Sequence, residues 1–448
     1  MPLVLYRPSK RPLVYEVVRL LTSTISTSSS SASAKWISAI KNTSSPTKSM
    51  QIYTQMQRQS IPVDSFAVLY TLTSCTHLQN LPLLRHLHAH ISKLGFTSNV
   101  YIMSSLLHGY SNACFDDARV VFDEMPERTI VTWNTMITGF SRSGNLNKAR
   151  SLFDEMPIRN TASWSAMIAS YINSGHQKKG ITLFHKMLTH EKLKPDHFSL
   201  CTILRACGHM ETIGLILGKS IHGFIIRHKY NLNVELGTSL VNMYAKSGFL
   251  KVASMVFNMM QYTNVVSWTS LICGAAQHGY IKEARTLFHE MQESHIKPNE
   301  FTFTGILSAC VHAGLVDEGR KYFKIMKDYG LKPKIHHYCC MVDLFGKAGE
   351  LEDAYEIIMK MEVDANINIL GSYLSSCKVQ CNFKMAERVI DRVMEMLNPE
   401  KDGGVYCLIA DLFALGEKWD DEERFRRLMV TQNVRKTRGV SFIRSVDK

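Results

Sequence analysis

The stretch VVSWTSLICGAAQHGYIKEARTLFHEMQESHIKPN, residues 265–299, decides the predicted fold. Its apolar residues recur every three or four positions in two short runs, and Gly279 separates the runs. This spacing predicts two amphipathic helices, with Trp268 on the apolar face of the first and Phe288 on that of the second. Neither helix can bury its apolar face alone, so the pair needs similar neighbours.

Similar neighbours are present along most of the chain. They share an aromatic residue near the start, a Gly between two helices, an Ala in the second helix, then a Leu-Phe or Val-Phe pair and a Met. A period of roughly 31–36 residues is typical of helical solenoids. We therefore predict an all-α fold, a right-handed superhelical solenoid of helix-turn-helix repeats over residues 36–366. After a shortened first repeat from Trp36, the predicted repeats are 65–99, 100–129, 130–160, 161–196, 197–233, 234–264, 265–299, 300–334 and 335–366.

The net charge narrows the class of ligand. The 52 Lys and Arg residues exceed the 39 Asp and Glu residues, which gives a formal charge of +13. A basic solenoid favours a polyanion, and RNA is the first candidate. The alternative is that the charge only keeps the protein in solution. Repetition and charge together favour nucleic acid.

The cysteines argue against a metal or disulfide framework. The 11 cysteines are odd in number, scattered through the repeats, and never spaced as C-x-x-C. We expect buried apolar cysteines, no metal site and no cofactor. We also expect no membrane segment, because no apolar run approaches the roughly 18–20 residues that a span needs.

The first 35 residues have a different composition from the rest. Residues 1–35 contain five Lys and Arg residues, one acid, Glu16, and a Ser/Thr-rich run at 22–33. This composition predicts a disordered organelle transit peptide that is removed, and an ordinary disordered tail is the alternative. A short amphipathic helix at 15–21 favours the mitochondrion, whereas the serine run favours the chloroplast. We take the mitochondrion as the first choice and the chloroplast as the alternative.

The repeat pattern drifts towards the carboxyl end. Residues 367–444 continue as helix pairs with a weaker motif, and residues 445–448 form a short tail. The basic stretch NVRKTRGVSFIRSVDK, 433–448, is compatible with a short strand.

The sequence WNTMITGFSRSGNLNKARSLFDEMP, 133–157, resembles a pentatricopeptide repeat. The mixture of repeats of about 31 and about 35 residues resembles the PLS subfamily of plant organelles. The resemblance covers nearly the whole chain after residue 35. Residues 88–96 and 221–230 resemble L-type repeats, 335–361 the last S-type repeat, 367–444 the E-type terminal repeats and 439–443 the end of that region. The related tetratricopeptide repeat fits less well, because its motif has Leu-Gly after the Trp, where this chain has Asn134-Thr135 and Thr269-Ser270.

The resemblance implies that each repeat takes one unpaired nucleotide. In the family, the fifth and last residues of a repeat read the base edge, and short polar side chains suit that task. The family's code then assigns Asn134 with Asn160 to a pyrimidine, Ser165 with Asp196 to G, Thr238 with Asn264 to A, and Thr269 with Asn299 to A. Apolar second residues, Val131, Ala162 and Val266, would sandwich the bases.

Five other pairs depart from this code and are expected to be silent or weak. They are Leu69/Asn99, Ser104/Thr129, Cys201/Asn233, Thr304/Lys334 and Cys339/Asn366. Family members bind RNA with the amino end at the 5′ side, so the expected core is pyrimidine, G, any base, A, A. The alternative for each pair is a capping or solvated polar group. Lys282 and Arg285 are candidates for phosphate contacts or for a solvated helix face.

No enzymatic motif emerges from the sequence. Some relatives end in a zinc deaminase domain, which needs H-x-E with P-C-x-x-C. Here His209 and Glu211 match H-x-E by chance, within a repeat and without C-x-x-C. The resemblance implies a non-catalytic site-recognition factor for C-to-U editing of organelle transcripts, with residues 367–444 recruiting a deaminase and other editing factors in trans. The alternatives are an RNA-binding factor for splicing, stability or translation, and a protein-binding helical scaffold.

Overall fold

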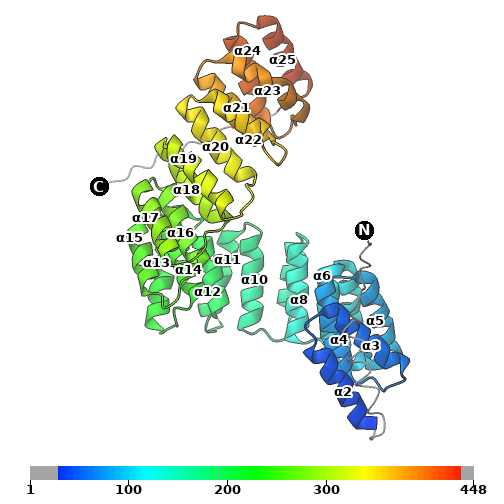
Figure 1. Cartoon of the computed structure of the whole chain (residues 1–448). Helices are drawn as coiled ribbons and strands as arrows, with labels where there is room; N and C mark the ends of the chain where they lie inside the picture. The colour runs from blue at the N-terminus through cyan, green and yellow to red at the C-terminus, as the bar shows by residue number, and fades with distance from the viewer. Residues whose placement is uncertain (1–28, 190, 435–448) are drawn as a thin grey trace, which may run out of the picture. The chain divides into compact units, whose positions relative to one another are not determined.

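The computed structural model describes residues 29–189 and 191–434, which form 24 α-helices, one short 3-10 turn and no strand (Figure 1). The predicted all-α helical solenoid is confirmed, and its right-handed superhelical turn stays a prediction. None of the helices in the described ranges is long and apolar enough to cross a membrane.

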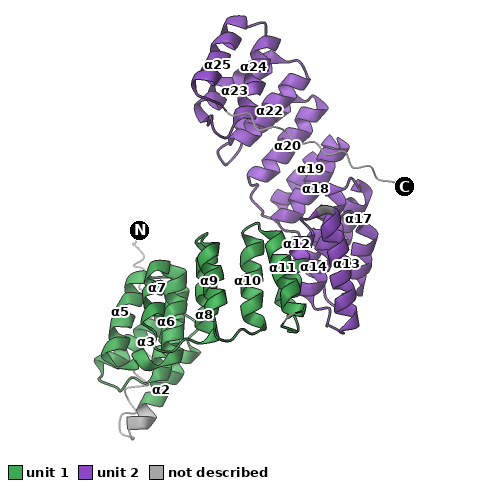
Figure 2. Ribbon diagram, turned by 180° about the vertical axis from the view of Figure 1, so that it is seen from behind, with its two compact units in different colours: residues 1–203 green, residues 204–448 purple. Residues whose placement is uncertain are grey.

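The helices fall into two compact units, residues 1–203 and 204–448, with the division inside α12 (His197–Cys207) (Figure 2). The first unit contains α2 (Ser29–Asn42), α3 (Pro46–Arg58), α4 (Ser65–Leu78), α5 (Leu81–Lys93), α6 (Val100–Ala113), α7 (Phe115–Glu124), α8 (Ile130–Arg142), α9 (Leu146–Glu155), α10 (Thr161–Asn173) and α11 (Gln177–Thr189). The second contains α13 (Glu211–Arg227), α14 (Val234–Lys246), α15 (Leu250–Met259), α16 (Val265–Gln277), α17 (Ile281–Glu293), α18 (Glu300–Ala313), α19 (Val316–Asp328), α20 (Ile335–Ala348), α21 (Leu351–Met359), α22 (Ile367–Val379), α23 (Phe383–Met396), α24 (Gly403–Leu415) and α25 (Trp419–Thr431).

The repeat borders coincide with helix starts. Every predicted repeat from residue 65 to residue 335, and the terminal region at 367, begins at the first residue of a helix. The first helix differs from the prediction, because α2 begins at Ser29 and not at Trp36. The rest of the proposed leader and the proposed strand after residue 434 lie outside the described residues.

Aromatic pairs join consecutive repeats. The Trp near the start of a first helix meets the Phe of the preceding second helix edge to face, a geometry worth about 0.5–1.5 kcal/mol beyond the buried area. The pairs are Phe122 with Trp133, Phe153 with Trp164 and Phe257 with Trp268, with ring centroids 5.2, 5.1 and 4.7 Å apart. The marks that define the repeat in the sequence therefore form the contacts between repeats.

Two kinds of glycine shape the repeats. Gly279 ends α16 with a φ of +77°, a left-handed conformation that Gly adopts without strain, as predicted for the break between the helices. Gly274 instead lets α14 and α16 approach closely, because a Cβ at this position would lie 2.4 Å from the Cβ of Ala245. Close packing of first helices thus depends on the absence of a side chain.

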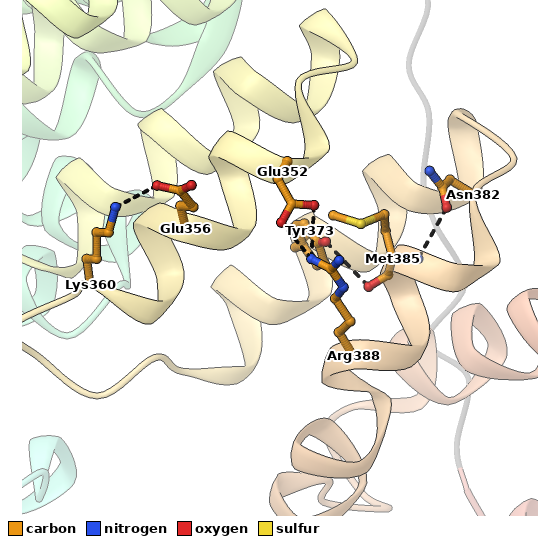
Figure 3. A network of polar contacts seen from close by, with 7 residues as sticks. All are labelled: Glu352, Glu356, Lys360, Tyr373, Asn382, Met385 and Arg388. Atoms are coloured by element: carbon orange, nitrogen blue, oxygen red, sulfur yellow. Dashed lines mark hydrogen bonds and ion pairs between the residues drawn. The ribbon is translucent and has the colours of Figure 1, made fainter.

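The predicted terminal region packs directly on the repeats before it. Arg388 of α23 donates to both carboxylate oxygens of Glu352 on α21, at 2.8 and 2.9 Å (Figure 3). The guanidinium of Arg388 also lies over the ring of Tyr355, 5.0 Å from its centroid. The Tyr373 hydroxyl of α22 donates to the carbonyl of Met385 at 3.4 Å. Residues 367–434 therefore continue the array within the second compact unit.

The close approach at Gly274 gives a test of the packing. We expect Gly274→Val to lower stability by about 1–3 kcal/mol, because the new side chain must displace α14. Gly223→Ala is the matched control, since a Cβ there meets nothing within 4 Å. This control should raise stability by about 0.5–1 kcal/mol because Ala suits a helix interior better. Thermal melting followed by far-UV circular dichroism measures both; equal melting temperatures would contradict the packing described.

Candidate nucleic-acid interface

The four predicted last-position residues all cap the helix that follows. One side-chain oxygen of each accepts a hydrogen bond from a backbone N–H in the first turn of that helix. The bonds run from Ser163 to Asn160 at 3.0 Å, from Ser199 to Asp196 at 2.8 Å, from Ser267 to Asn264 at 3.0 Å and from Thr302 to Asn299 at 2.9 Å. Capping, the alternative raised from the sequence, therefore occurs at all four residues, and it occupies one atom of each.

The atoms that capping leaves over differ in chemistry. A capping Asn has used its carbonyl oxygen, so its NH₂ group remains as a donor. The capping Asp196 keeps a second carboxylate oxygen, which can only accept. Guanine presents N–H donors on its Watson–Crick edge, whereas adenine and the pyrimidines present an acceptor at the ring nitrogen or carbonyl beside it. The geometry thus suits Asp196 to guanine and the asparagines to other bases.

Two predicted fifth-position residues are joined to their partners. The Ser165 hydroxyl donates to Oδ1 of Asp196 at 3.1 Å, so this pair is in direct contact. Thr269 reaches Asn299 through Thr302: the two hydroxyls lie 2.7 Å apart, and the Thr302 hydroxyl donates to Oδ1 of Asn299 at 3.0 Å. In these two repeats, the fifth and last residues of the same repeat therefore lie together.

The other two fifth-position residues have unused polar atoms. Oδ1 of Asn134 and Oγ1 of Thr238 are buried and have no hydrogen-bond partner in the described part of the chain. Such atoms are uncommon in folded proteins and point to a missing partner. Within residues 29–189 and 191–434, no hydrogen bond joins Asn134 to Asn160 or Thr238 to Asn264.

One cavity gathers the predicted residues of two neighbouring repeats. Asn134, Ser165 and Asp196 line a cavity of about 690 Å³ in the first compact unit. The predicted sandwiching residue Ala162 lines it too, as does Phe198, the second residue of the next repeat. Hydrogen-bonding groups and apolar surface thus meet in a space suited to a planar base.

The second residues of the repeats form an exposed row. Val131 is 64% exposed, Val266 is 52% exposed and Ala162 is exposed as well. Sequence reasoning missed the aromatic members of this row, although the second position of every repeat identifies them; they are Phe66, Tyr101, Phe198 and Phe301. Exposed aromatic rings are natural stacking partners for unpaired bases. The ring of Phe301 is nearly parallel to that of His336, with an angle of 5° and centroids 6.4 Å apart.

The two candidate phosphate contacts on α17 have other roles. Arg285 forms an ion pair with Glu318 at 2.7 Å, and Lys282 lies beside Glu283 in a groove on the second helices. A different cationic cluster was missed. Nζ of Lys246 lies 3.1 Å from Nε2 of His209 in a cavity of about 360 Å³ whose lining contains no carboxylate.

The electrostatics of this cluster favour an anion. Burial lowers the pKa of Lys246, and burial together with the nearby Lys246 and Arg205 lowers the pKa of His209. Both lowered pKa values disfavour the positive forms, and a negative ligand would offset this effect by favouring them. The chance H-x-E match at His209 therefore belongs to a basic surface. Among the described residues, no group of three or more His, Cys, Asp or Glu side chains is placed to hold a metal.

The capping role of Asn264 can be tested by thermal melting. We expect Asn264→Ala to lower stability by about 1 kcal/mol, because the first turn of α16 loses its cap. Asn264→Asp retains an oxygen for the same bonds and should melt close to the unmodified protein. Thermal melting of the two variants measures the difference. If both variants melted alike, Asn264 would not act as the cap.

Family models match several of the repeats described above. The PPR repeat matches residues 131–160, 162–191, 238–265, 301–331 and 336–364. The PPR repeat family matches residues 263–312, and the E motif matches residues 381–444.

Curated plant proteins resemble most of the chain. Pentatricopeptide repeat-containing protein CRR2, chloroplastic, from Arabidopsis thaliana is 34% identical over 395 residues, which cover 87% of this chain and 55% of the relative. A mitochondrial pentatricopeptide repeat-containing protein of the same plant is 32% identical over 402 residues, 89% of this chain and 78% of the relative. The chain thus spans about half the length of the first relative and about three quarters of the second.

Solved structures support the fold. The crystal structure of the pentatricopeptide repeat protein PPR10 from maize superposes with a TM-score of 0.64 at 16% identity, over 95% of this chain and 62% of that one. PPR10 in complex with an 18-nt psaJ RNA element superposes with a TM-score of 0.50 at 14% identity, over 96% of this chain and 76% of that one.

Proposed function

This chain belongs to the plant pentatricopeptide repeat family, in its E-type PLS subfamily, and we propose that it binds single-stranded organelle RNA in a sequence-specific manner and selects sites for C-to-U editing. The observation that carries the proposal is the cavity that Asn134, Ser165 and Asp196 line, beside the exposed row of second residues. The complex of PPR10 with RNA supports it from the same fold. The chain itself acts without catalysis, as a recognition factor.

Each reading pair would take one base of the core pyrimidine, G, any base, A, A. Asp196 accepts from the N–H groups of guanine, and Ser165 holds the carboxylate through its hydrogen bond. Asn160, Asn264 and Asn299 donate their free NH₂ groups to bases that present an acceptor. The second residues stack on the bases, and the cluster of His209 and Lys246 contacts phosphate.

The guanine pair gives a test with an internal template. We expect the double substitution Ser165→Thr with Asp196→Asn to change the preferred base from G to A, because it installs the Thr/Asn combination already present at Thr238 and Asn264. Against the original RNA the loss should be about 1–3 kcal/mol, the usual cost of one wrong base. Binding titrations on four RNAs that differ only at this base measure it.

The controls for this experiment use the same RNAs. The melting temperature should stay unchanged, because Asn caps α12 as well as Asp does. Ser104→Thr, in a pair outside the code, should leave the base preference unchanged. A double variant that still preferred G would contradict the assignment of Ser165 and Asp196.

We further propose that residues 367–444 recruit a deaminase and other editing factors in trans. The E motif supports this role, since it matches residues 381–444. The described part of this region presents apolar side chains to solvent on α25, where Trp419 is 61% exposed and Val430 is 80% exposed. Exposed aromatic and branched side chains are common anchors of protein interfaces. Packing of α22 and α23 on α21 would join these anchors to the repeats of the second compact unit.

Surface substitutions test recruitment without disturbing the fold. We expect Trp419→Ala with Val430→Ser to reduce editing by at least about tenfold, because the partner loses its apolar anchors. RNA affinity should stay within twofold, roughly the accuracy of a titration. Complementation of a plant lacking the protein, followed by sequencing of organelle RNA, measures editing. Met359→Ser is the matched control, an exposed apolar residue on α21 outside the region; normal editing by the double variant would remove α25 from the recruitment role.

The proposal also covers the organelle in which the protein acts and two alternative functions. Relatives are named as chloroplastic or mitochondrial proteins, which supports an organelle. We propose the mitochondrion first and the chloroplast as the alternative, with residues 1–35 as transit peptide. A factor for splicing, stability or translation would leave editing intact in the same sequencing experiment. A protein-binding scaffold would show no salt-dependent RNA affinity.

A further inference from the structure

A groove between α15 and α17 has no role in base reading. Two adjoining cavities of about 460 and about 580 Å³ form it and share Leu250, Ser254, Asn258 and Glu283 in their linings. Its remaining walls are largely apolar and include Phe257 and Leu271 in the first cavity and Phe249 and Met255 in the second. The groove lies on the second helices of two repeats, away from the capping row at the start of the first helices.

In other repeats, an arginine at the position that matches this groove reaches from one second helix to the next. In five second helices, an Arg directly follows the first buried residue of the helix. These helices are α5, α7, α9, α17 and α19. In three of them it crosses to an acid on the second helix of the next repeat. These ion pairs are Arg85 with Asp117 at 2.8 Å, Arg285 with Glu318 at 2.7 Å, and Arg320 with Asp353 at 2.8 Å.

The α15 repeat lacks the arginine, whereas the next repeat keeps the acid on α17. Ser254 follows Ala253, where the other helices have Arg, and Glu283 precedes Ala284 as Asp117 precedes Ala118. Within residues 29–189 and 191–434, Glu283 forms no ion pair. The groove therefore lies where an arginine at position 254 would place its guanidinium, beside the carboxylate of Glu283.

A second difference accompanies the missing arginine. Arg320 lies over the ring of Phe345, 4.4 Å from its centroid, and Arg119 lies over Phe140 at 5.8 Å. Both rings occupy the eleventh position of their repeats, and at that position the repeat 265–299 has Ala275. Neither the arginine nor the aromatic ring fills the groove beside α15.

A buried donor in the groove also has no partner. Trp268, 6% exposed, lines the first cavity, and its indole Nε1 has no acceptor in the described part of the chain. Across both cavities the lining holds two carboxylates, Glu283 and Glu290, and two ammonium groups, Lys251 and Lys282. Glu283 lines both cavities, and a ligand that satisfies it carries a positive group.

We infer that this groove binds an arginine side chain that a partner polypeptide presents. The guanidinium takes the place of the missing arginine and pairs with Glu283, as Arg285 pairs with Glu318. The aliphatic part of the arginine packs on Leu250 and Phe257, beside the indole of Trp268. RNA matches this lining less well, because the carboxylate of Glu283, which both cavities share, would repel a phosphate.

The probe is a short peptide with a defined counterpart. An acetylated, amidated Ala-Arg-Leu peptide is compared with Ala-citrulline-Leu, which has the same shape and no charge. The reporter is the indole N–H signal of Trp268 in a ¹⁵N-labelled full-length chain, assigned among the five tryptophans with Trp268→Phe. We expect a saturable shift of this signal with the arginine peptide and an affinity at least about tenfold lower for the citrulline peptide.

Two variants and one control decide the result. Ser254→Arg should fill the groove with the chain's own guanidinium and abolish the shift, and Glu283→Gln should weaken binding at least about tenfold. Thr182→Arg adds the same charge at an exposed position of α11 and should bind like the unmodified protein. Equal binding of both peptides, binding that survives Ser254→Arg, or no shift at millimolar peptide would each overturn the proposal. RNA affinity should be the same for all these variants, so the test is independent of the proposed function.

Discussion

The hydrogen bond between the last side chain of one repeat and the first turn of the next is the constraint on which the proposed reading surface depends. It fixes Asn160, Asp196, Asn264 and Asn299 in position through one oxygen atom. A free polar side chain would lose rotamer entropy on meeting a base, whereas a capping side chain has already lost it during folding. The capping bond therefore both stabilises the helix and orients the atoms left for recognition.

Most of the fold followed from spacing alone. The Trp, the Phe and the glycine break are strong local signals, and they are the same residues that form the contacts between repeats. Each repeat must bury its apolar face on its neighbours, so the residues that form this face recur in every period of the sequence. The start of α2 at Ser29 was missed because its first residues, Ser29 to Ser31, are weaker helix formers than Ala and carry no apolar period.

The site was less predictable, because spacing does not state what each atom touches. The sequence predicted the reading pairs, but not that Ser165 contacts Asp196 directly while Thr269 reaches Asn299 through Thr302. The exposed Phe198 and Phe301 resemble core residues until their place in the repeat is considered. The groove beside Ser254 is harder still to foresee, because only comparison with helices where an ion pair forms shows what is missing.

The role of Thr302 has a consequence for how far the repeats are independent modules. Thr302 belongs to one repeat, yet its hydroxyl joins the two reading residues of the repeat before it. A chain of hydrogen bonds of this kind polarises its members together, so their contributions do not add. Moving the repeat 265–299 into another array without Thr302 would keep Thr269 and Asn299 but remove the hydrogen bonds that join them. For this part of the chain, the hydrogen-bonded unit is therefore longer than the unit that repeats.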